Sequence, residues 1–595
     1  MITRRSALAV LGSAGIGTAV FQRALAATAG DGPVSPQMVA DAEWVAGIKL
    51  TEPQREAVVN VFKKFAREEL GRLRPIELDN SLLPGLRFAP LASPASCPDP
   101  RGYEVKKAPA PGPEALLSDP LSRPDSDEDL AFSSIRQLGK LLRDRRISSV
   151  ELTKLYLDRL RRYDPLLKCV VTFMDELALK QAERADRELR AGNDRGPLHG
   201  IPWGVKDIIS WPGYATTWGV SQYRDRVIDV KAAVAERLEN AGAVLVAKLA
   251  TNTLAGGSVL WYRGITRNPW NPRKDASGSS SGSAAATAAG LVGFSIGTET
   301  TGSLIGPSIV CGAVGLRPTY GRVSRYGCMQ LCWSLDKIGP ICRSADDCGL
   351  VLAAIHGADP RDAASVDRPY VWPSTRELST IRAGYVADGG EDEKRDDLRL
   401  LRELGVKLVP VEPPNMKKDY GLPKNEIISG LVASESAAAL EDLTRRGGPK
   451  GVKGWPAYLM LGHFLTAVDY LRLNRLRAIV MQRFDKMMQA VDVFLCSDEK
   501  PGGDTDDQWD WYSNMTGYPK IAFPKAFEAK DGFPMPKPVM MIGRVYDEST
   551  LLTLAHACQR AIGLTQRPPL DQFLSQKDEI LKDEEFPDEN KYYAD

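Results

Sequence analysis

Apolar positions alternate between helical spacing and short continuous runs from about residue 130 onward. Residues 147–152 have the pattern of a helix N-cap, and the amphipathic spacing that follows predicts a helix extending to Arg162. The same reasoning predicts helices at 176–191, 232–241, 283–290 and through much of 426–490, and strands at 243–247, 292–296 and 491–495. Such alternation is typical of an α/β core in which helices cover a sheet.

The segments flanking this pattern have a different character. Near the N-terminus, a stretch rich in helix formers places Val58 and Val59 on one apolar face, which predicts a helical appendage over residues 35–90. A Pro-, Ser- and Asp-rich stretch follows, and this composition predicts a linker over 91–129. Residues 564–595 are acidic, and we expect this C-terminal tail to pack loosely.

The charge of the chain is nearly balanced. It has 77 Lys+Arg and 76 Asp+Glu, so its formal net charge is +1 at pH 7. Nucleic acid and anionic membranes attract proteins with a strong basic excess, which this chain as a whole lacks. We therefore expect no nucleic-acid partner.

The first 26 residues resemble a targeting peptide. Arg4 and Arg5 precede an apolar stretch at 7–20, and Ala24-Leu25-Ala26 offers a small-x-small cleavage pattern. Paired arginines favour the twin-arginine route, so we expect export, to the periplasm. An uncleaved anchor is the alternative, but the apolar stretch is shorter than the roughly 20 residues that a span needs. We thus expect no stable membrane span in the mature protein, whose net charge falls from +1 to −2 without the leader's three arginines.

The chain has nine cysteines, four of which cluster at Cys328, Cys332, Cys342 and Cys348. Their spacing is not the paired C-x-x-C of a metal site, and apolar residues adjoin most of them. We interpret them as buried structural thiols. One or two disulfides, or a metal site, are the alternatives that the sequence leaves open.

Three segments carry candidate chemistry. Lys206 lies in the apolar run 200–209, where burial would lower its pKa and make it a neutral base. Small residues at 277–283 permit close backbone approach, and the Gly-flanked turn at 297–303 can point successive N–H groups at one spot. Taken singly, each has a plainer interpretation: an edge-strand lysine in water, a flexible linker and a polar loop.

One further alternative concerns Ser280. The sequence Gly278-Ser279-Ser280-Ser281-Gly282 matches the G-x-S-x-G elbow, which would make Ser280 a nucleophile with a histidine base. That elbow requires a strand directly before it, but residues 268–275 have the composition of a loop. The elbow is therefore disfavoured.

Together, these segments resemble the amidase signature family. The family's Gly/Ser-rich run and its GT[DE]xxGS motif correspond to 277–283 and 297–303, and the runs at 311–324 and 334–340 also match in order. Segments at 268–272 and 514–519 extend the resemblance, which covers about 130–563. It implies an α/β fold with a large mixed, twisted sheet core surrounded by helices, with the helical appendage added at the N-terminus.

The resemblance also implies a Ser-Ser-Lys triad. Ser303 would be the nucleophile that forms an acyl-enzyme, Ser279 the bridging serine after a cis peptide bond from Gly278, and Lys206 the base. Backbone N–H groups at Thr300, Thr301 and Gly302 would form the oxyanion hole and bind substrate. This chemistry needs no metal and no cofactor, and none is expected.

The sequence departs from the commonest family pattern near the nucleophile. Glu299 stands where Asp is usual, Thr301 where Gly is frequent, and no Arg follows Ser303 at the usual spacing. These departures leave the amide substrate open. We expect an exported serine amidohydrolase acting on a small-molecule amide. The alternatives are a glutaminase subunit of amidotransferase type, or a non-catalytic binding protein on an amidase core, and a homodimer is left open.

Overall fold

The computed structural model describes residues 34–46, 48–62, 122–256, 259–387, 390, 392–412, 414, 426–445, 455–496 and 508–582. The predicted leader, residues 63–90 of the predicted appendage and residues 91–121 of the predicted linker lie outside these residues. The chain forms two compact units. The larger comprises 86–414 and 479–589, and the smaller comprises 1–85, 415–478 and 590–595.

Eleven strands within the described ranges form one mixed sheet in the larger unit. The β3–β2, β2–β6, β11–β9 and β9–β10 pairs are parallel, and the other neighbouring strands are antiparallel. In spatial order the strands are β1 (Val170–Phe173), β3 (Val244–Leu249), β2 (Pro202–Lys206), β6 (Phe294–Glu299), β8 (Lys337–Cys342), β7 (Val314–Arg317), β12 (Lys520–Lys530), β13 (Phe533–Gly543), β11 (Val493–Cys496), β9 (Arg382–Tyr385) and β10 (Lys407–Pro410).

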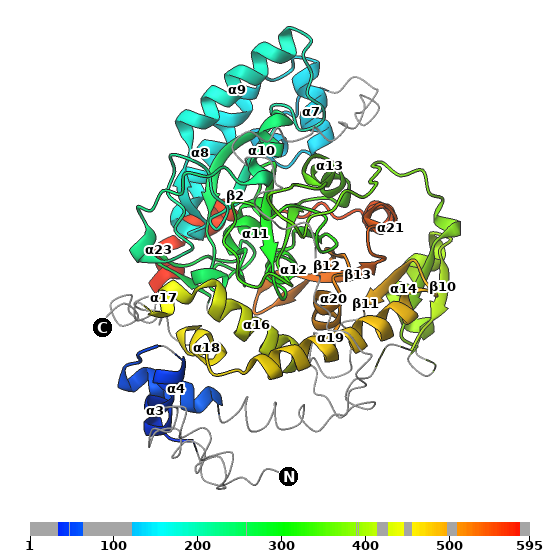
Figure 1. Ribbon diagram of the computed structural model, residues 1–595. Coiled ribbons are helices and arrows are strands. Elements are labelled where there is room, and N and C mark those ends of the chain that lie inside the picture. Colours follow the sequence, from blue (N-terminus) through cyan, green and yellow to red (C-terminus); the bar gives the residue numbers. More distant parts are fainter. Residues whose placement is uncertain are drawn as a thin grey trace, which may run out of the picture. The chain divides into compact units, whose positions relative to one another are not determined.

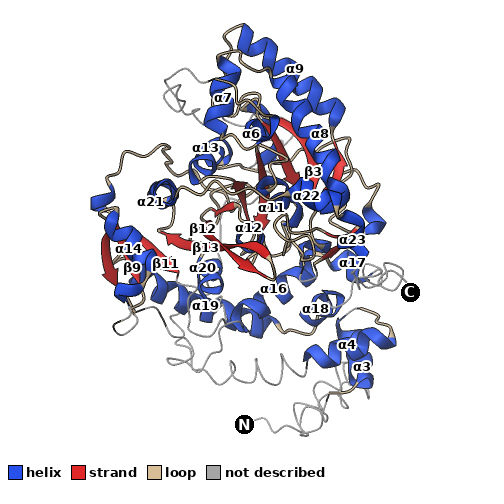
Figure 2. Cartoon of the chain, turned by 180° about the vertical axis from the view of Figure 1, so that it is seen from behind, coloured by secondary structure: helices blue, strands red, loops and turns tan. Residues whose placement is uncertain are grey.

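Helices surround this sheet. Figures 1 and 2 show α8 and α9 near the end of the sheet formed by β1, β3 and β2, and α14 beside β9 and β10 at the other end. The α/β fold with a large mixed sheet surrounded by helices is confirmed. The longer helices of this unit are α7 (Ile135–Arg143), α8 (Ser149–Leu167), α9 (Asp175–Arg190), α10 (Ala233–Asn240), α11 (Ser281–Ala288), α13 (Ala345–Ile355), α14 (Asp396–Glu403), α20 (Gln508–Thr516) and α21 (Glu548–Ile562).

Local sequence signals account for where α8 begins. Ser148 is its N-cap and forms a capping box with Glu151, in which each side chain bonds the other residue's backbone N–H. The helix continues past the predicted end at Arg162 to Leu167, and Lys168 closes it in the left-handed conformation. The buried face includes Leu152, so the amphipathic spacing reports packing against the core.

The register of two parallel strands positions the candidate chemistry. Trp203 pairs with Phe294 and Val205 with Ile296, so β2 and β6 run side by side in the same direction. β2 ends at Lys206 and β6 ends at Glu299. The segments that leave the carboxyl ends of both strands therefore start from the same edge of the sheet.

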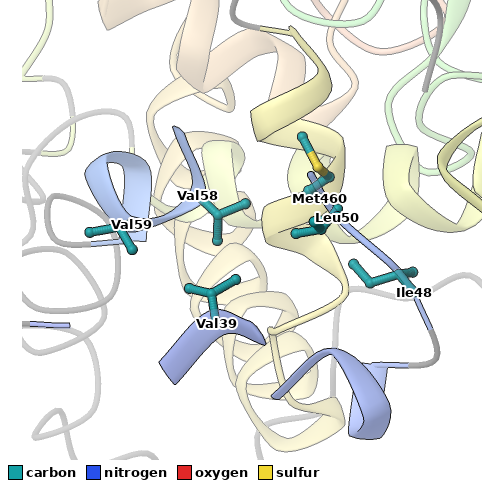
Figure 3. Packing of buried hydrophobic residues seen from close by; sticks show 6 residues of the cluster. All are labelled: Val39, Ile48, Leu50, Val58, Val59 and Met460. Carbon is teal, nitrogen blue, oxygen red and sulfur yellow. The ribbon is translucent and has the colours of Figure 1, made fainter. Parts of the chain in front are cut away.

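The smaller unit contains the N-terminal helices α3 (Pro36–Ala46) and α4 (Glu52–Phe62), together with α16 (Glu426–Ala439), α17 (Glu441–Arg445) and α18 (Trp455–Gly462). The division falls inside α19 (Ala467–Met488). Val39, Ile48, Leu50, Val58 and Val59 pack with Met460 of α18 (Figure 3). The predicted apolar face with Val58 and Val59 thus packs against α18. The predicted bounds of the body over 130–563 stay a prediction.

The expectation of a loose C-terminal tail is wrong for the described residues. Two short helices follow α21: α22 (Leu570–Ser575) and α23 (Lys577–Lys582). Leu570, Phe573 and Ile580 are buried, and Tyr163 Oη of α8 donates a hydrogen bond to Asp571 (2.6 Å). Apolar residues spaced among the acidic ones thus attach this segment to the larger unit.

In the described part of the chain, eight cysteines are free thiols and seven of them are buried, as the apolar surroundings predicted. Cys97 lies outside the described residues. Among those residues, no cluster of three or more His, Cys, Asp or Glu side chains is arranged to hold a metal ion. Within the same ranges, no helix combines the length and apolarity that crossing a bilayer requires.

Candidate active site

Lys206 is enclosed by the fold. It ends a fully buried strand that lies between β3 and β6, and its side chain is 0% exposed. Its Nζ donates hydrogen bonds to Ser279 Oγ (2.8 Å) and to Thr298 Oγ1 (2.8 Å). The interpretation as an edge-strand lysine in water is therefore wrong, because the strand is central and two hydroxyl groups take the place of water around the amine.

The buried position changes the acidity of this lysine. Burial lowers the pKa of Lys206 to about 7, and the negative charges of Asp336 and Glu299 oppose this shift only in part. A substantial fraction of the amine is then neutral at pH 7, with a lone pair available to accept a proton. Lys206 thus has the acidity expected of a general base near neutral pH.

Ser279 lies in a tightly held segment. The Gly278–Ser279 peptide bond is cis, as the family resemblance implied. Ser279 is 1% exposed, its carbonyl accepts the N–H of Asn252 (3.1 Å), and the next residue opens the buried helix α11. The linker interpretation of residues 277–283 is therefore wrong.

The side chain of Ser280 has a structural role. Its Oγ donates to the carbonyl of Thr298 (3.1 Å) and accepts from the N–H of the same residue (3.2 Å). No strand directly precedes residue 278 in this described segment. The nucleophile-elbow alternative is not supported.

The turn at 300–303 follows β6 and leads into α12 (Ile305–Cys311). Thr301, Gly302 and Ser303 are partly exposed, and Gly302 has a φ of +109°. Within the described residues, no protein acceptor takes the backbone N–H groups of these three residues. The turn therefore presents several N–H donors and the Ser303 hydroxyl where a ligand can reach them.

The structure brings Lys206 and Ser279 into contact and places Ser303 against the residue that follows Ser279. Lys206 contacts Ser279 directly, and the N–H of the neighbouring Ser280 donates to the carbonyl of Ser303 (3.0 Å). Thr298 was missed by sequence reasoning as a partner of Lys206, although it lies inside the GTETTGS motif.

Glu299, one of the departures from the family pattern, has a supporting role. Its carboxylate pairs with buried Arg317 and accepts the N–H groups of Leu304 (3.0 Å) and Ile305 (2.9 Å) at the start of α12. Burial alone would raise its pKa, but Arg317, Lys337 and the N–H of Ile305 lower it to about 2. Glu299 is thus an anion that anchors the residues following Ser303.

Gly278 provides a test of this packing. A Cβ at this position would lie 1.7 Å from Nδ2 and 2.5 Å from Cγ of Asn252. We expect Gly278→Ala to destabilise the fold by about 3 kcal/mol, because this part of the core has no free space. We also expect activity to fall about 100-fold through displacement of Ser279. Thermal unfolding and steady-state kinetics measure both effects.

Gly306→Ala is the matched control for this substitution. A Cβ there would lie 3.6 Å from Ser277 Oγ, an ordinary contact distance. We expect this variant to unfold at or slightly above the wild-type temperature, because alanine favours the helix. Equal stability of the two variants would contradict the packing described at Gly278.

A family model described as Amidase matches residues 151–552, a range that contains Lys206, Ser279 and Ser303. The chain belongs to the amidase family. It is an enzyme that hydrolyses carbon–nitrogen bonds of amides.

Curated and solved relatives of this amidase agree with that assignment. A glutamyl-tRNA(Gln) amidotransferase subunit from Carboxydothermus hydrogenoformans is 32% identical over 73% of this chain and 98% of its own length. The solved structure of peptide amidase from Stenotrophomonas maltophilia is 28% identical, with a TM-score of 0.63 over 74% of this chain and 99% of that chain. Fatty acid amide hydrolase shares the fold at 20% identity, with a TM-score of 0.64 over 74% and 87%.

Proposed function

We propose that this amidase hydrolyses a carboxamide through an acyl-enzyme on Ser303, with Ser279 as the bridging serine and Lys206 as the base. The observation that carries the proposal is the hydrogen bond between the fully buried Lys206 Nζ and Ser279 Oγ (2.8 Å). A serine hydroxyl is a weak nucleophile until a neighbouring base takes its proton. A neutral amine has one lone pair and two N–H groups, so Lys206 can accept from Ser279 while it donates to Thr298.

The acylation step follows from this arrangement. Ser303 Oγ forms a bond to the amide carbonyl carbon, its proton passes to Ser279 Oγ, and the Ser279 proton passes to Lys206 Nζ. The carbonyl oxygen becomes an oxyanion, which the N–H groups of the 300–303 turn stabilise. The C–N bond then breaks as the leaving nitrogen takes a proton back through Ser279, so charge and protons balance.

Deacylation reverses the roles with water. A water molecule attacks the Ser303 ester carbonyl and gives its proton through Ser279 to Lys206. The C–O bond to Ser303 breaks, and the returning proton restores the Ser303 hydroxyl while the carboxylic acid departs. The products are an acid and an amine or ammonia.

A panel of amides tests the reaction class. C-terminally amidated peptides, aryl amides, short aliphatic amides and glutamine are incubated with the enzyme, and ammonia or amine release is measured. We propose that simple amides are hydrolysed without partner subunits and that Ser303→Ala abolishes this release. Complete inactivity of folded wild-type protein on the whole panel would oppose the proposal.

The curated relatives provide a second candidate. They are amidotransferase subunits, matched over nearly their whole length, so a glutaminase that supplies ammonia to a partner is the alternative. The predicted leader opposes it, because charging of tRNA takes place in the cytoplasm. Glutamine turnover that requires co-purifying subunits would favour this alternative.

The enzyme's location is part of the proposal. The Arg4-Arg5 pair, the apolar stretch and the Ala24-Leu25-Ala26 site support twin-arginine export to the periplasm. Fractionation of the native host and N-terminal sequencing of the mature protein test this. We expect periplasmic enzyme that begins after Ala26, and cytoplasmic retention when both arginines are replaced by lysine. Full-length protein in the cytoplasm would overturn the export proposal and leave the amidase reaction untouched.

A further inference from the structure

One loop contacts both the segment that follows β2 and the segment that follows β6. We call residues 327–336 the bridging loop. At one end, the N–H of Met329 donates to the carbonyl of Ile208 (2.9 Å), and Cys328 forms a β-bridge with Ile209. Both of these partners come within three residues after Lys206. The bridging loop therefore begins against the carboxyl end of β2.

The other end of the bridging loop is fixed by Asp336. Its Oδ1 accepts a hydrogen bond from Thr300 Oγ1 (2.7 Å). Its Oδ2 accepts the N–H groups of Leu331 (2.8 Å) and Cys332 (2.9 Å) within the loop itself. One carboxylate thus connects the bridging loop to the first residue of the 300–303 turn.

These contacts form a closed ring that includes Lys206. The ring runs from Lys206 through Ile208 and the bridging loop to Asp336, then through Thr300 and Thr298 back to Lys206. The Thr300 side chain is thus a tether that joins the turn to the rest of the ring. Donors of an oxyanion hole are effective when their direction is fixed before the charge develops, so such a tether matters for rate.

The charge of the same carboxylate also acts on Lys206. Two anions act on Lys206, Asp336 and Glu299, and Glu299 is neutralised by Arg317 and Lys337. Arg325 acts on Asp336 but is itself paired with Asp362 (3.0 Å). The remaining nearby pair, Asp207 with Lys248 on β3 (2.7 Å), is internally balanced.

The surroundings of Asp336 act on its acidity in two senses. Burial raises the pKa of Asp336 above its ordinary value, while the hydrogen bonds from Thr300, Cys332 and Leu331 oppose this rise only in part. The negative charge of the carboxylate raises the pKa of Lys206. Asp336→Asn therefore removes a charge that favours protonated Lys206.

We propose that Asp336 is a positioning residue: it fixes the 300–303 turn, through Thr300, relative to Lys206. This inference rests on the proposed Ser303 acyl-enzyme reaction and adds a residue to it. Two variants separate the tether from the charge. Thr300→Val removes the donated hydrogen bond and keeps the carboxylate, whereas Asp336→Asn removes the charge and keeps the shape.

We expect both variants to lower kcat about 10- to 100-fold, because the donors lose their fixed direction, with KM for a short aliphatic amide changed by less than about threefold. Asp336→Asn should in addition move the acidic limb of the kcat/KM profile to lower pH, because the anion that favours protonated Lys206 is gone. Thr300→Val should leave the limb in place. Thr300→Ser, which keeps the hydroxyl, should restore most of kcat.

Asp347→Asn is the control for a buried carboxylate. Asp347 also accepts a backbone N–H, that of Ile135 (2.9 Å), and it is not among the groups that act on Lys206. We expect this control to leave both kcat and the pH limb unchanged. If Thr300→Ser is as slow as Thr300→Val, or if Asp336→Asn leaves kcat and the limb at wild-type values, the inference is overturned. Wild-type enzyme without Ser303-dependent turnover would instead overturn the proposed function.

Discussion

Ser303→Ala is expected to lower kcat about 10⁵- to 10⁶-fold, because it removes the atom that would form the acyl-enzyme. The residue lies in a partly exposed turn, and no protein side chain in the described ranges depends on its hydroxyl. The loss of one exposed hydroxyl should therefore change the free energy of unfolding by less than about 0.5 kcal/mol. Steady-state kinetics with an amide substrate, together with thermal unfolding, measures both quantities.

The control for this variant is Ser549→Ala on α21. Ser549 Oγ donates to the carbonyl of Val371 (2.8 Å), in an exposed position outside the site. We expect wild-type kcat from this control. Residual activity of Ser303→Ala above about 1% of wild type would mean that another group is the nucleophile, since removal of a nucleophile normally costs far more.

Lys206→Met should have the second largest effect, with kcat lowered about 10⁴-fold or more through loss of the base. The wild-type rate should rise with pH through a limb near pH 7, since burial lowers the pKa of Lys206 to about 7 and the neutral amine is the active form. This limb should be absent from the residual activity of the variant. A pH–rate profile of kcat/KM for both enzymes measures it.

Lys206→Met should lower activity without lowering the stability of the fold. The lowered pKa means that the folded state binds fewer protons at Lys206 than the unfolded chain between about pH 7 and 10.5. In that window, the contribution of Lys206 to stability rises with pH, and below it the full penalty of burying the charge is present. Lys206→Met removes this penalty, so we expect it to unfold at or above the wild-type temperature at pH 6.

Lys248 on the adjacent strand β3 is the matched control. Both Lys248 and its partner Asp207 have fully buried side chains, with Nζ and Oδ1 2.7 Å apart. Lys248→Met leaves that carboxylate without its cation, which typically costs about 3–5 kcal/mol. We expect marked destabilisation with the limb near pH 7 retained. A Lys206→Met variant that is destabilised like Lys248→Met and keeps the limb would refute the assignment of Lys206 as the base.

Elements with local signals were predicted well from the sequence. The capping box at Ser148 and Glu151 fixed the start of α8, and the apolar spacing after it reported the buried face. For α9, α10 and β3, the spacing of apolar residues within each segment was also enough to predict the element. Such signals involve contacts within one or two helical turns or with a directly adjacent layer.

Features that depend on distant parts of the chain were not predictable in this way. The burial of Lys206 depends on the position of β2 between β3 and β6. No local sequence pattern predicts this strand order. Asp336 and Thr300 are 36 positions apart and meet only because β6 and β8 pair. The three residues of the proposed triad came from the family resemblance, and each of their segments taken singly had favoured a plainer interpretation.

Site mapping of a fluorophosphonate adduct tests the central proposal most directly. Wild-type enzyme is treated with the probe, digested, and its modified peptide sequenced by mass spectrometry, with Lys206→Met treated in parallel. We expect a single adduct on Ser303 in the wild type and labelling at least about 100-fold slower in the variant, since the serine then lacks its base. An adduct on Ser279, Ser280 or any other residue, or labelling of Ser303 at the same rate without Lys206, would contradict it.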